Sequence, residues 1–154
     1  MNKKRWLLCI FSALVVLSAC GKAENPSESA TVKDAPVKEA PELRLLEDQS
    51  VGEYLADSKG ITLYYFKKDK EGTSNCSGEC LKKWPPFTEK EFEVPTGYKK
   101  EDFGSITRED DGQEQVTYKG YPLYYFAGDK QEGDRKGQGV KGVWYIVNKN
   151  INFQ

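Results

Sequence analysis

The chain has 154 residues, with 23 basic and 24 acidic side chains and no histidine. This balance of charge argues against a nucleic-acid partner, which requires a clustered basic surface. The lack of histidine excludes the haem-attachment motif Cys-x-x-Cys-His, histidine-ligated zinc sites and catalytic sites that depend on a histidine base. The length suits one domain with additional segments.

Residues 1–20 have the pattern of a secretory signal. Three basic residues at 3–5 precede an apolar run at 6–16 that is shorter than the roughly 20 residues a spanning helix needs. The segment ends in Leu17-Ser18-Ala19-Cys20, which resembles the bacterial lipobox. The resemblance implies removal of residues 1–19 and attachment of diacylglycerol and palmitate-type acyl chains to Cys20, which would then anchor the chain in a lipid bilayer. The alternative is an ordinary signal peptide with Cys20 near the cut by chance.

The segment at 20–41 predicts a disordered tether between the lipidated cysteine and the folded domain. It contains Pro26, Pro36 and Pro41, charges of both signs and no aromatic residue. Such a composition buries too little apolar surface to offset the entropy lost on ordering. A helical stalk is the alternative, and the three prolines argue against it.

Residues 42–154 predict a mostly β domain. Short β-prone runs separated by glycine-containing turns favour two hairpin-based repeats, at about 52–87 and 114–148, packed as a small sandwich or barrel-like sheet. Only one short helical turn is expected, at 80–84, before Pro85 and Pro86. The expected strands lie at 43–47, 53–56, 61–66, 115–118, 121–126 and 143–147.

An internal repeat is the clearest feature of the domain. Residues 59–70 match residues 119–130 at eight of twelve positions, and Trp84 matches Trp144 at the same spacing of sixty. The domain therefore looks like two copies of one unit.

The aromatic residues of the repeat predict a covered core. Alternate residues of a strand share a face, so Tyr64 and Phe66 lie together, as do Tyr124 and Phe126. We interpret these side chains as core residues whose hydroxyl groups reach the rim. A platform for a ligand or quinone, or an electron relay, is the alternative.

Asp69 and Asp129 each follow the phenylalanine of their repeat by three positions. An aspartate at this place most simply begins a turn by accepting backbone N–H groups. A cation site is the alternative, although calcium needs several oxygen ligands at close spacing and a lysine follows each aspartate.

The loops after the two aspartates differ. The first contains Cys76 and Cys80, which in an oxidising compartment predict a structural disulfide that ties down the loop. A redox-active pair is the alternative, but the spacing is wider than in thioredoxin-like motifs. The second loop, at 133–142, is rich in glycine and is interpreted as a flexible hairpin loop, with anion binding as its alternative.

The segments Tyr64–Asp69 and Tyr124–Asp129 both fit the signature Tyr-x-(Phe/Trp/Tyr)-x-x-Asp. With Asn75–Cys80 leading to Trp84-Pro85-Pro86, they resemble a family of bacterial secreted-repeat lipoproteins named for that signature. The resemblance implies a secreted repeat domain and carries over no catalytic residue, since the family is largely uncharacterised.

The sequence thus predicts an extracytoplasmic lipoprotein, anchored on the outer face of the cytoplasmic membrane or at the outer membrane of a two-membrane cell. We expect a non-catalytic module, without cofactor, that binds an envelope protein or a small ligand. The first alternative is an envelope redox component, acting through Cys76 and Cys80 or as an accessory to extracellular electron transfer. A metal or haem carrier using Tyr and Asp oxygens is the second.

Overall fold

The computed structural model describes residues 40–153, which belong to one compact unit. The predicted signal peptide at 1–19, the lipidation at Cys20 and almost all of the tether at 20–41 lie outside the described residues. Among the described residues the helices are short, and none has the length and apolar character needed to cross a membrane.

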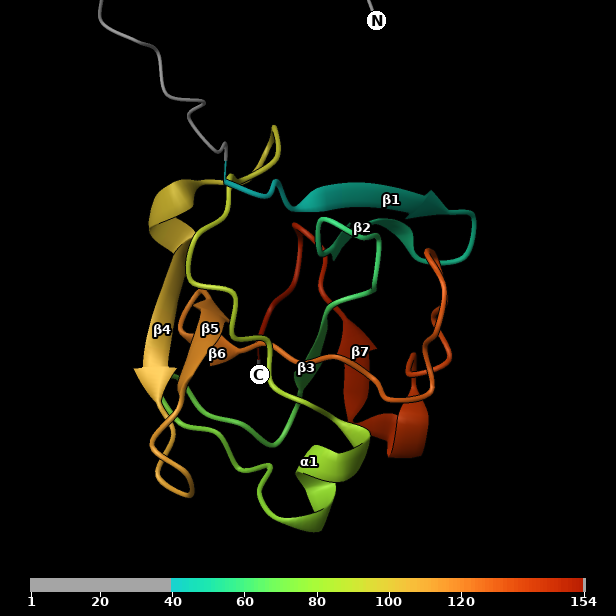
Figure 1. Ribbon diagram of the computed structural model, residues 1–154. Helices are drawn as coiled ribbons and strands as arrows, with labels where there is room; N and C mark the ends of the chain where they lie inside the picture. Colours follow the sequence, from blue (N-terminus) through green and yellow to red (C-terminus); the bar gives the residue numbers. More distant parts are fainter. Residues whose placement is uncertain (1–39, 154) are drawn as a thin grey trace, which may run out of the picture. The chain divides into compact units, whose positions relative to one another are not determined.

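Seven strands and three short helices form the described region (Figure 1). The helices are α1 (Glu79–Lys83) and the 3-10 turns η1 (Lys100–Asp102) and η2 (Val140–Gly142). The strands are β1 (Arg44–Asp48), β2 (Gly52–Ala56), β3 (Tyr64–Phe66), β4 (Phe103–Thr107), β5 (Glu114–Tyr118), β6 (Tyr121–Pro122) and β7 (Trp144–Ile146).

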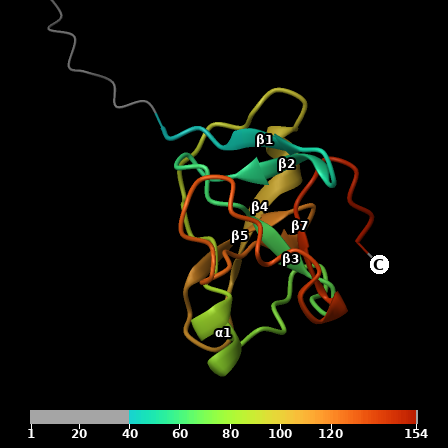
Figure 2. The ribbon, with the colours of Figure 1, turned by 90° about the vertical axis from the view of Figure 1, so that its right-hand side faces the viewer.

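The strands pair in three small antiparallel sheets: β1 with β2, β3 with β7, and β4 with β5 and β6. The predictions of a mostly β fold, of two repeats and of the helical turn near Cys80 are confirmed. The sheets of the described region do not close into a barrel. Strands β1 and β2 lie at one end of the domain and α1 at the other, in both of two perpendicular views (Figure 2).

The two repeats have the same strand plan. Arg44 of β1 pairs with Ala56 of β2, and Gly104 of β4 pairs with Thr117 of β5. After each of these hairpins the chain turns at a glycine with positive φ, Gly60 at 80° and Gly120 at 81°. Each repeat therefore begins with a hairpin and continues into its Tyr-Tyr-Phe segment.

The sequence predicts a hairpin between residues 53–56 and 61–66. Its turn is present, but the paired region is shorter than predicted. Asp57 N donates to Ile61 O at 2.9 Å and Leu63 N to Leu55 O at 3.0 Å. Beyond that point β3 leaves β2 and pairs with β7 instead. The strand changes partner because the Tyr64 side chain is buried against the second repeat.

Each repeat ends in a closing segment, residues 84–86 in the first repeat and 144–146 in the second. Each closing segment pairs with the Tyr-Tyr-Phe segment of the other repeat. Strand β3 of the first repeat pairs with β7 of the second. Conversely, residues 124–126 of the second repeat lie against residues 84–86 of the first, where Tyr125 N donates to Pro85 O and Ala127 N to Lys83 O, both at 2.8 Å. The two prolines at 85 and 86 have no N–H group, so this second pairing does not develop into a regular ladder.

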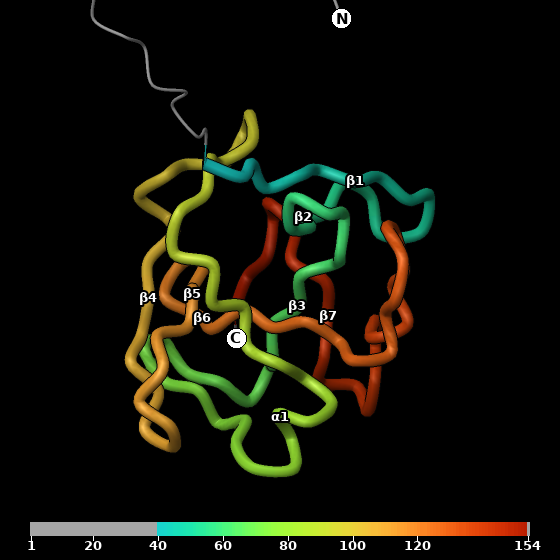
Figure 3. The backbone as a smooth tube through the Cα atoms, in the orientation of Figure 1, coloured from blue at the N-terminus to red at the C-terminus, as the bar shows by residue number. Residues whose placement is uncertain are grey.

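The repeats meet at their first tyrosines. Tyr64 N donates to Tyr124 O at 2.8 Å, and Tyr124 N donates back to Tyr64 O at 2.9 Å. The two residues thus form a reciprocal antiparallel pair. Strand β3, which begins at Tyr64, lies near the middle of the backbone trace (Figure 3).

Two hydrophobic clusters fill the domain. One surrounds Leu63 and Leu123 and includes Phe87, Phe92, Tyr118 and Val147. The other contains Tyr64, Tyr124, Trp84, Trp144 and Cys76 and is largely aromatic.

Candidate functional site

The aromatic cluster is held together by two exchanged hydrogen bonds. The Tyr64 hydroxyl donates to Asp129 Oδ2 at 2.6 Å, and the Tyr124 hydroxyl donates to Asp69 Oδ2 at 2.7 Å. All four residues are buried. The prediction that the tyrosines form the core is confirmed, but the expectation that their hydroxyls reach the rim is wrong, because each finds a buried carboxylate of the other repeat.

Each aspartate also holds its own loop, as the sequence predicts. Asp69 Oδ1 accepts a hydrogen bond from Asn75 N at 2.6 Å, and Asp129 Oδ1 accepts one from Lys136 N at 2.9 Å. The signature spacing thus serves two purposes at once. It fixes the start of the loop within one repeat and provides the acceptor for the tyrosine of the other.

The buried carboxyl groups have raised pKa values. Burial raises the pKa of Asp69 to about 6, against the opposing effects of the hydrogen bonds from Asn75 and Tyr124. Burial also raises the pKa of Asp129, opposed by the hydrogen bond from Tyr64. The pKa values of both tyrosines rise as well, mainly through burial. The phenols therefore stay neutral donors.

Four aromatic rings lie in a row beside these pairs and are called the stack here, although the fourth ring, Phe126, is tilted by 38° against Trp84. The centroid distances are 4.2 Å between Phe66 and Trp144, 3.8 Å between Trp144 and Trp84, and 4.5 Å between Trp84 and Phe126. The two tryptophan planes are within 3° of parallel. The sequence repeat places a Phe and a Trp in each copy, and the exchange packs each Phe against the other copy's Trp.

A groove of about 580 Å³ lies over this stack. All four stacked rings line it, and the two divergent loops supply its sides. From the first loop and α1 come Glu79, Cys80 and Lys83, and from the second loop come Val140, Lys141 and Val143; Lys68 completes the lining.

The predicted disulfide joins Cys76 and Cys80, whose Cα atoms lie 5.4 Å apart. Cys76 is fully buried, whereas Cys80 is half-buried and contacts the groove. One half of the disulfide thus lines the groove, and the other is buried.

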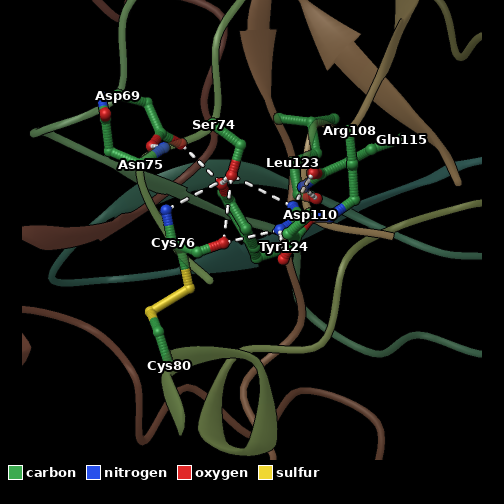
Figure 4. The surroundings of a disulfide bond; sticks show 10 residues. All are labelled: Asp69, Ser74, Asn75, Cys76, Cys80, Arg108, Asp110, Gln115, Leu123 and Tyr124. Atoms are coloured by element: carbon green, nitrogen blue, oxygen red, sulfur yellow. Dashed lines mark hydrogen bonds and ion pairs between the residues drawn. A yellow bond between two sulfur atoms is a disulfide. The ribbon is translucent and has the colours of Figure 1, made fainter. Parts of the chain in front are cut away.

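Arg108 holds the backbone beside the disulfide (Figure 4). Its side chain is buried and donates to Cys76 O at 2.6 Å, to Gln115 Oε1 at 2.5 Å and to Ser74 Oγ at 3.0 Å. Ser74 Oγ lies 2.7 Å from the Tyr124 hydroxyl, so the network reaches the exchanged pair with Asp69. Sequence reasoning missed Arg108, because it directly precedes the acidic run at 109–114, which is typical of a solvated surface.

A cation site is the alternative role that the sequence leaves open for Asp69 and Asp129. Among residues 40–153, no three or more Cys, Asp and Glu side chains come together in a way that could hold a metal ion.

The glycine-rich loop lies against the core, where a Cβ added at Gly137 would meet the Tyr64 ring at 2.8 Å. Glycine at 137 therefore lets the loop backbone lie directly against the Tyr64 ring, because a Cβ at this position would clash with it.

Comparison with known proteins fits this architecture. A family model described as a secreted repeat of unknown function matches residues 47–88 and 105–148, more than half of the chain. The chain belongs to this secreted-repeat family. The two matches begin in β1 and β4 and end just after each closing segment, so each family repeat is one structural repeat. No curated protein and no solved structure matches the chain. Membership of a secreted-repeat family indicates an extracytoplasmic location.

Proposed function

We propose that this secreted-repeat protein is a non-catalytic binding module of the cell envelope, anchored in the membrane by lipid on Cys20. Its ligand occupies the groove over the four stacked rings. The observation that carries this proposal is the groove itself, about 580 Å³ in volume and lined by aromatic residues from both repeats. Ligand sites of small domains are typically concave and mostly apolar, with a few polar groups at the edge.

The composition of the groove supports binding rather than a purely structural role. Phe66 and Phe126 are only half-buried, although both belong to the stack. The loops on either side differ between the repeats, whereas the rings beneath them are the same in both. A shared floor with two different sides is a suitable arrangement for recognising an asymmetric ligand.

Calorimetric titration of the full chain with 2-naphthoate and with 2-naphthamide tests the binding role. We expect at least one of these flat probes to bind, and Phe126→Ala to abolish binding. Phe103→Ala is the matched control, because Phe103 is half-buried in the other hydrophobic cluster. Absence of binding by both probes, or loss of binding in the Phe103 variant alone, would overturn the groove as the site.

Fatty-acid labelling tests the anchor. Cells fed an alkyne-tagged palmitate should label the protein, and Cys20→Ala should abolish the label. Cys9→Ala is the control and should leave the label unchanged, because Cys9 lies in the predicted signal peptide. Unchanged labelling of the Cys20 variant would contradict lipidation at that residue.

A redox role for the disulfide is the second candidate. It is favoured by one observation, the position of the half-buried Cys80 in the lining of the groove. A reduction potential of about −200 mV or higher would support exchange with an envelope partner, and one below about −300 mV would support a structural staple.

A further inference from the structure

We infer that the ligand of the groove is a small aromatic acid, with a flat ring system and a carboxylate, sulfonate or phosphate group. The inference rests on the proposed function, because it names the ligand class of the same groove. It is carried by two separate observations, the aromatic floor of the groove and the charge of its lining.

The floor of the groove is aromatic. Phe66, Trp144, Trp84 and Phe126 all line it, and the two phenylalanines are only half-buried. Aromatic rings prefer offset-stacked or edge-to-face contacts with one another, which add to the gain from burial of apolar area. A flat aromatic ligand lying on this floor would make such contacts.

The lining of the groove carries an excess of positive charge. Lys68, Lys83 and Lys141 line it, and all three are solvent-exposed. Within residues 40–153, none of the three forms an ion pair. The one carboxylate in the lining, Glu79, is bound by Lys82 at 2.6 Å. The charge complement of this groove is therefore an anion.

The backbone at Lys141 is a further sign that its side chain matters. Lys141 adopts a left-handed conformation with φ 52° and ψ 18°, in a loop where glycines take the neighbouring positive-φ positions at 139 and 142. A side chain other than glycine is disfavoured in this conformation. Strain of this kind is often retained where a side chain serves a function.

Titration of the full chain with three probes of the same size tests both halves of the inference. We expect 2-naphthoate to bind about tenfold more tightly than 2-naphthamide, its neutral isostere, because exposed ion pairs each contribute a modest gain. The difference should shrink at high salt. Decahydro-2-naphthoate keeps the charge but loses the flat π face, and it should bind more weakly than 2-naphthoate.

The outcomes separate this inference from the proposed function. Equal affinity for 2-naphthoate and 2-naphthamide would overturn the anionic ligand but leave the binding module intact. Equal affinity for the saturated acid would overturn the aromatic ligand. Absence of binding by all three probes would overturn the inference together with the groove as a site.

Two glycine substitutions locate the effect. Lys141→Gly and Lys119→Gly remove the same charge and relieve the same kind of backbone strain, since these are the two non-glycine residues with positive φ in the described region. Lys119 lies outside the groove, with its ammonium over the Tyr118 ring. Only Lys141→Gly should weaken 2-naphthoate binding, by about two- to fivefold, without changing 2-naphthamide binding.

Both variants should melt at the same or a higher temperature than the parent chain, which excludes misfolding as the cause of weaker binding. Unchanged 2-naphthoate affinity in Lys141→Gly, or an equal loss in Lys119→Gly, would overturn the anionic site at the groove.

Discussion

The two repeats share their interior and differ in the loop that follows the motif aspartate. Both contribute a tyrosine, an aspartate, a phenylalanine and a tryptophan to the same exchanged contacts. The first loop is closed by a disulfide and held by Arg108. The second has no counterpart of that bond and instead packs Gly137 against the aromatic core.

This difference shows which parts of the unit depend on the partner repeat. Neither repeat alone can bury its aspartate with a tyrosine donor or complete the stack, so the shared residues depend on the exchange. The loops share only the contact with the motif aspartate, and beyond it each is stabilised in its own way. They meet again at the groove, where they form two unlike sides over one common floor.

Removing either tryptophan should cause the largest loss of stability, because both repeats depend on the stack. Trp84→Ala and Trp144→Ala should each reduce the free energy of unfolding by about 3–5 kcal/mol, since each leaves a large cavity in the stack. Urea unfolding of both variants and of the double variant measures the coupling between them. Losses that simply add would contradict a shared stack, because contacting residues couple by about 0.5–3 kcal/mol.

The pH dependence of stability tests the buried aspartates. A carboxyl group whose pKa is raised on folding holds its proton more tightly in the folded chain, so its contribution is most favourable below pH of about 4 and is lost as pH rises to about 6. For Asp69, with a pKa of about 6, the loss is up to about 3 kcal/mol.

The difference in unfolding free energy between the parent chain and Asp69→Asn, measured from pH 4 to pH 7, isolates this contribution. The parent should gain stability relative to the variant as the pH falls. Asp129→Asn should show the same sign, because burial raises that pKa too. A difference that does not change with pH would contradict the raised pKa values.

Removing a tyrosine hydroxyl should have the next largest effect. Tyr64→Phe and Tyr124→Phe each take a hydrogen bond from a buried carboxylate and should cost about 2–3 kcal/mol. Similar losses are expected for the two variants, because each hydroxyl also has a second partner, Gly137 N at 3.3 Å for Tyr64 and Ser74 Oγ at 2.7 Å for Tyr124. Tyr65→Phe is the control and should change stability by less than about 0.5 kcal/mol.

Loss of the disulfide should have the smallest effect and should be confined to the first repeat. The double variant Cys76→Ser and Cys80→Ser should lose about 2 kcal/mol, because the ring closed by the bond is short. Hydrogen exchange should speed up in α1 and the preceding loop, and it should stay slow in β3 and β7. Faster exchange in both repeats would show that the bond holds the whole domain.

Much of the fold could be predicted, because its signals are local or repeated along the chain. The similarity between 59–70 and 119–130 revealed the repeat, and a separation of four positions in a flexible loop allowed the disulfide between Cys76 and Cys80. The partner of β3 could not be predicted, because a turn signal points to the neighbouring strand and contains no information about β7. Arg108 was missed for a similar reason, since burial of an arginine depends on acceptors far away along the chain.

The sequence by itself determined that this is a secreted two-repeat β protein, because repetition, composition and strand patterns are properties of the chain. It also supplied every residue of the groove, but in four separated segments. Only the tertiary structure decided that the repeats exchange their closing segments, and that exchange aligns each Tyr with the other repeat's Asp and each Phe with the other repeat's Trp. Burial drives this choice, since neither repeat can cover its aromatic surface without the other.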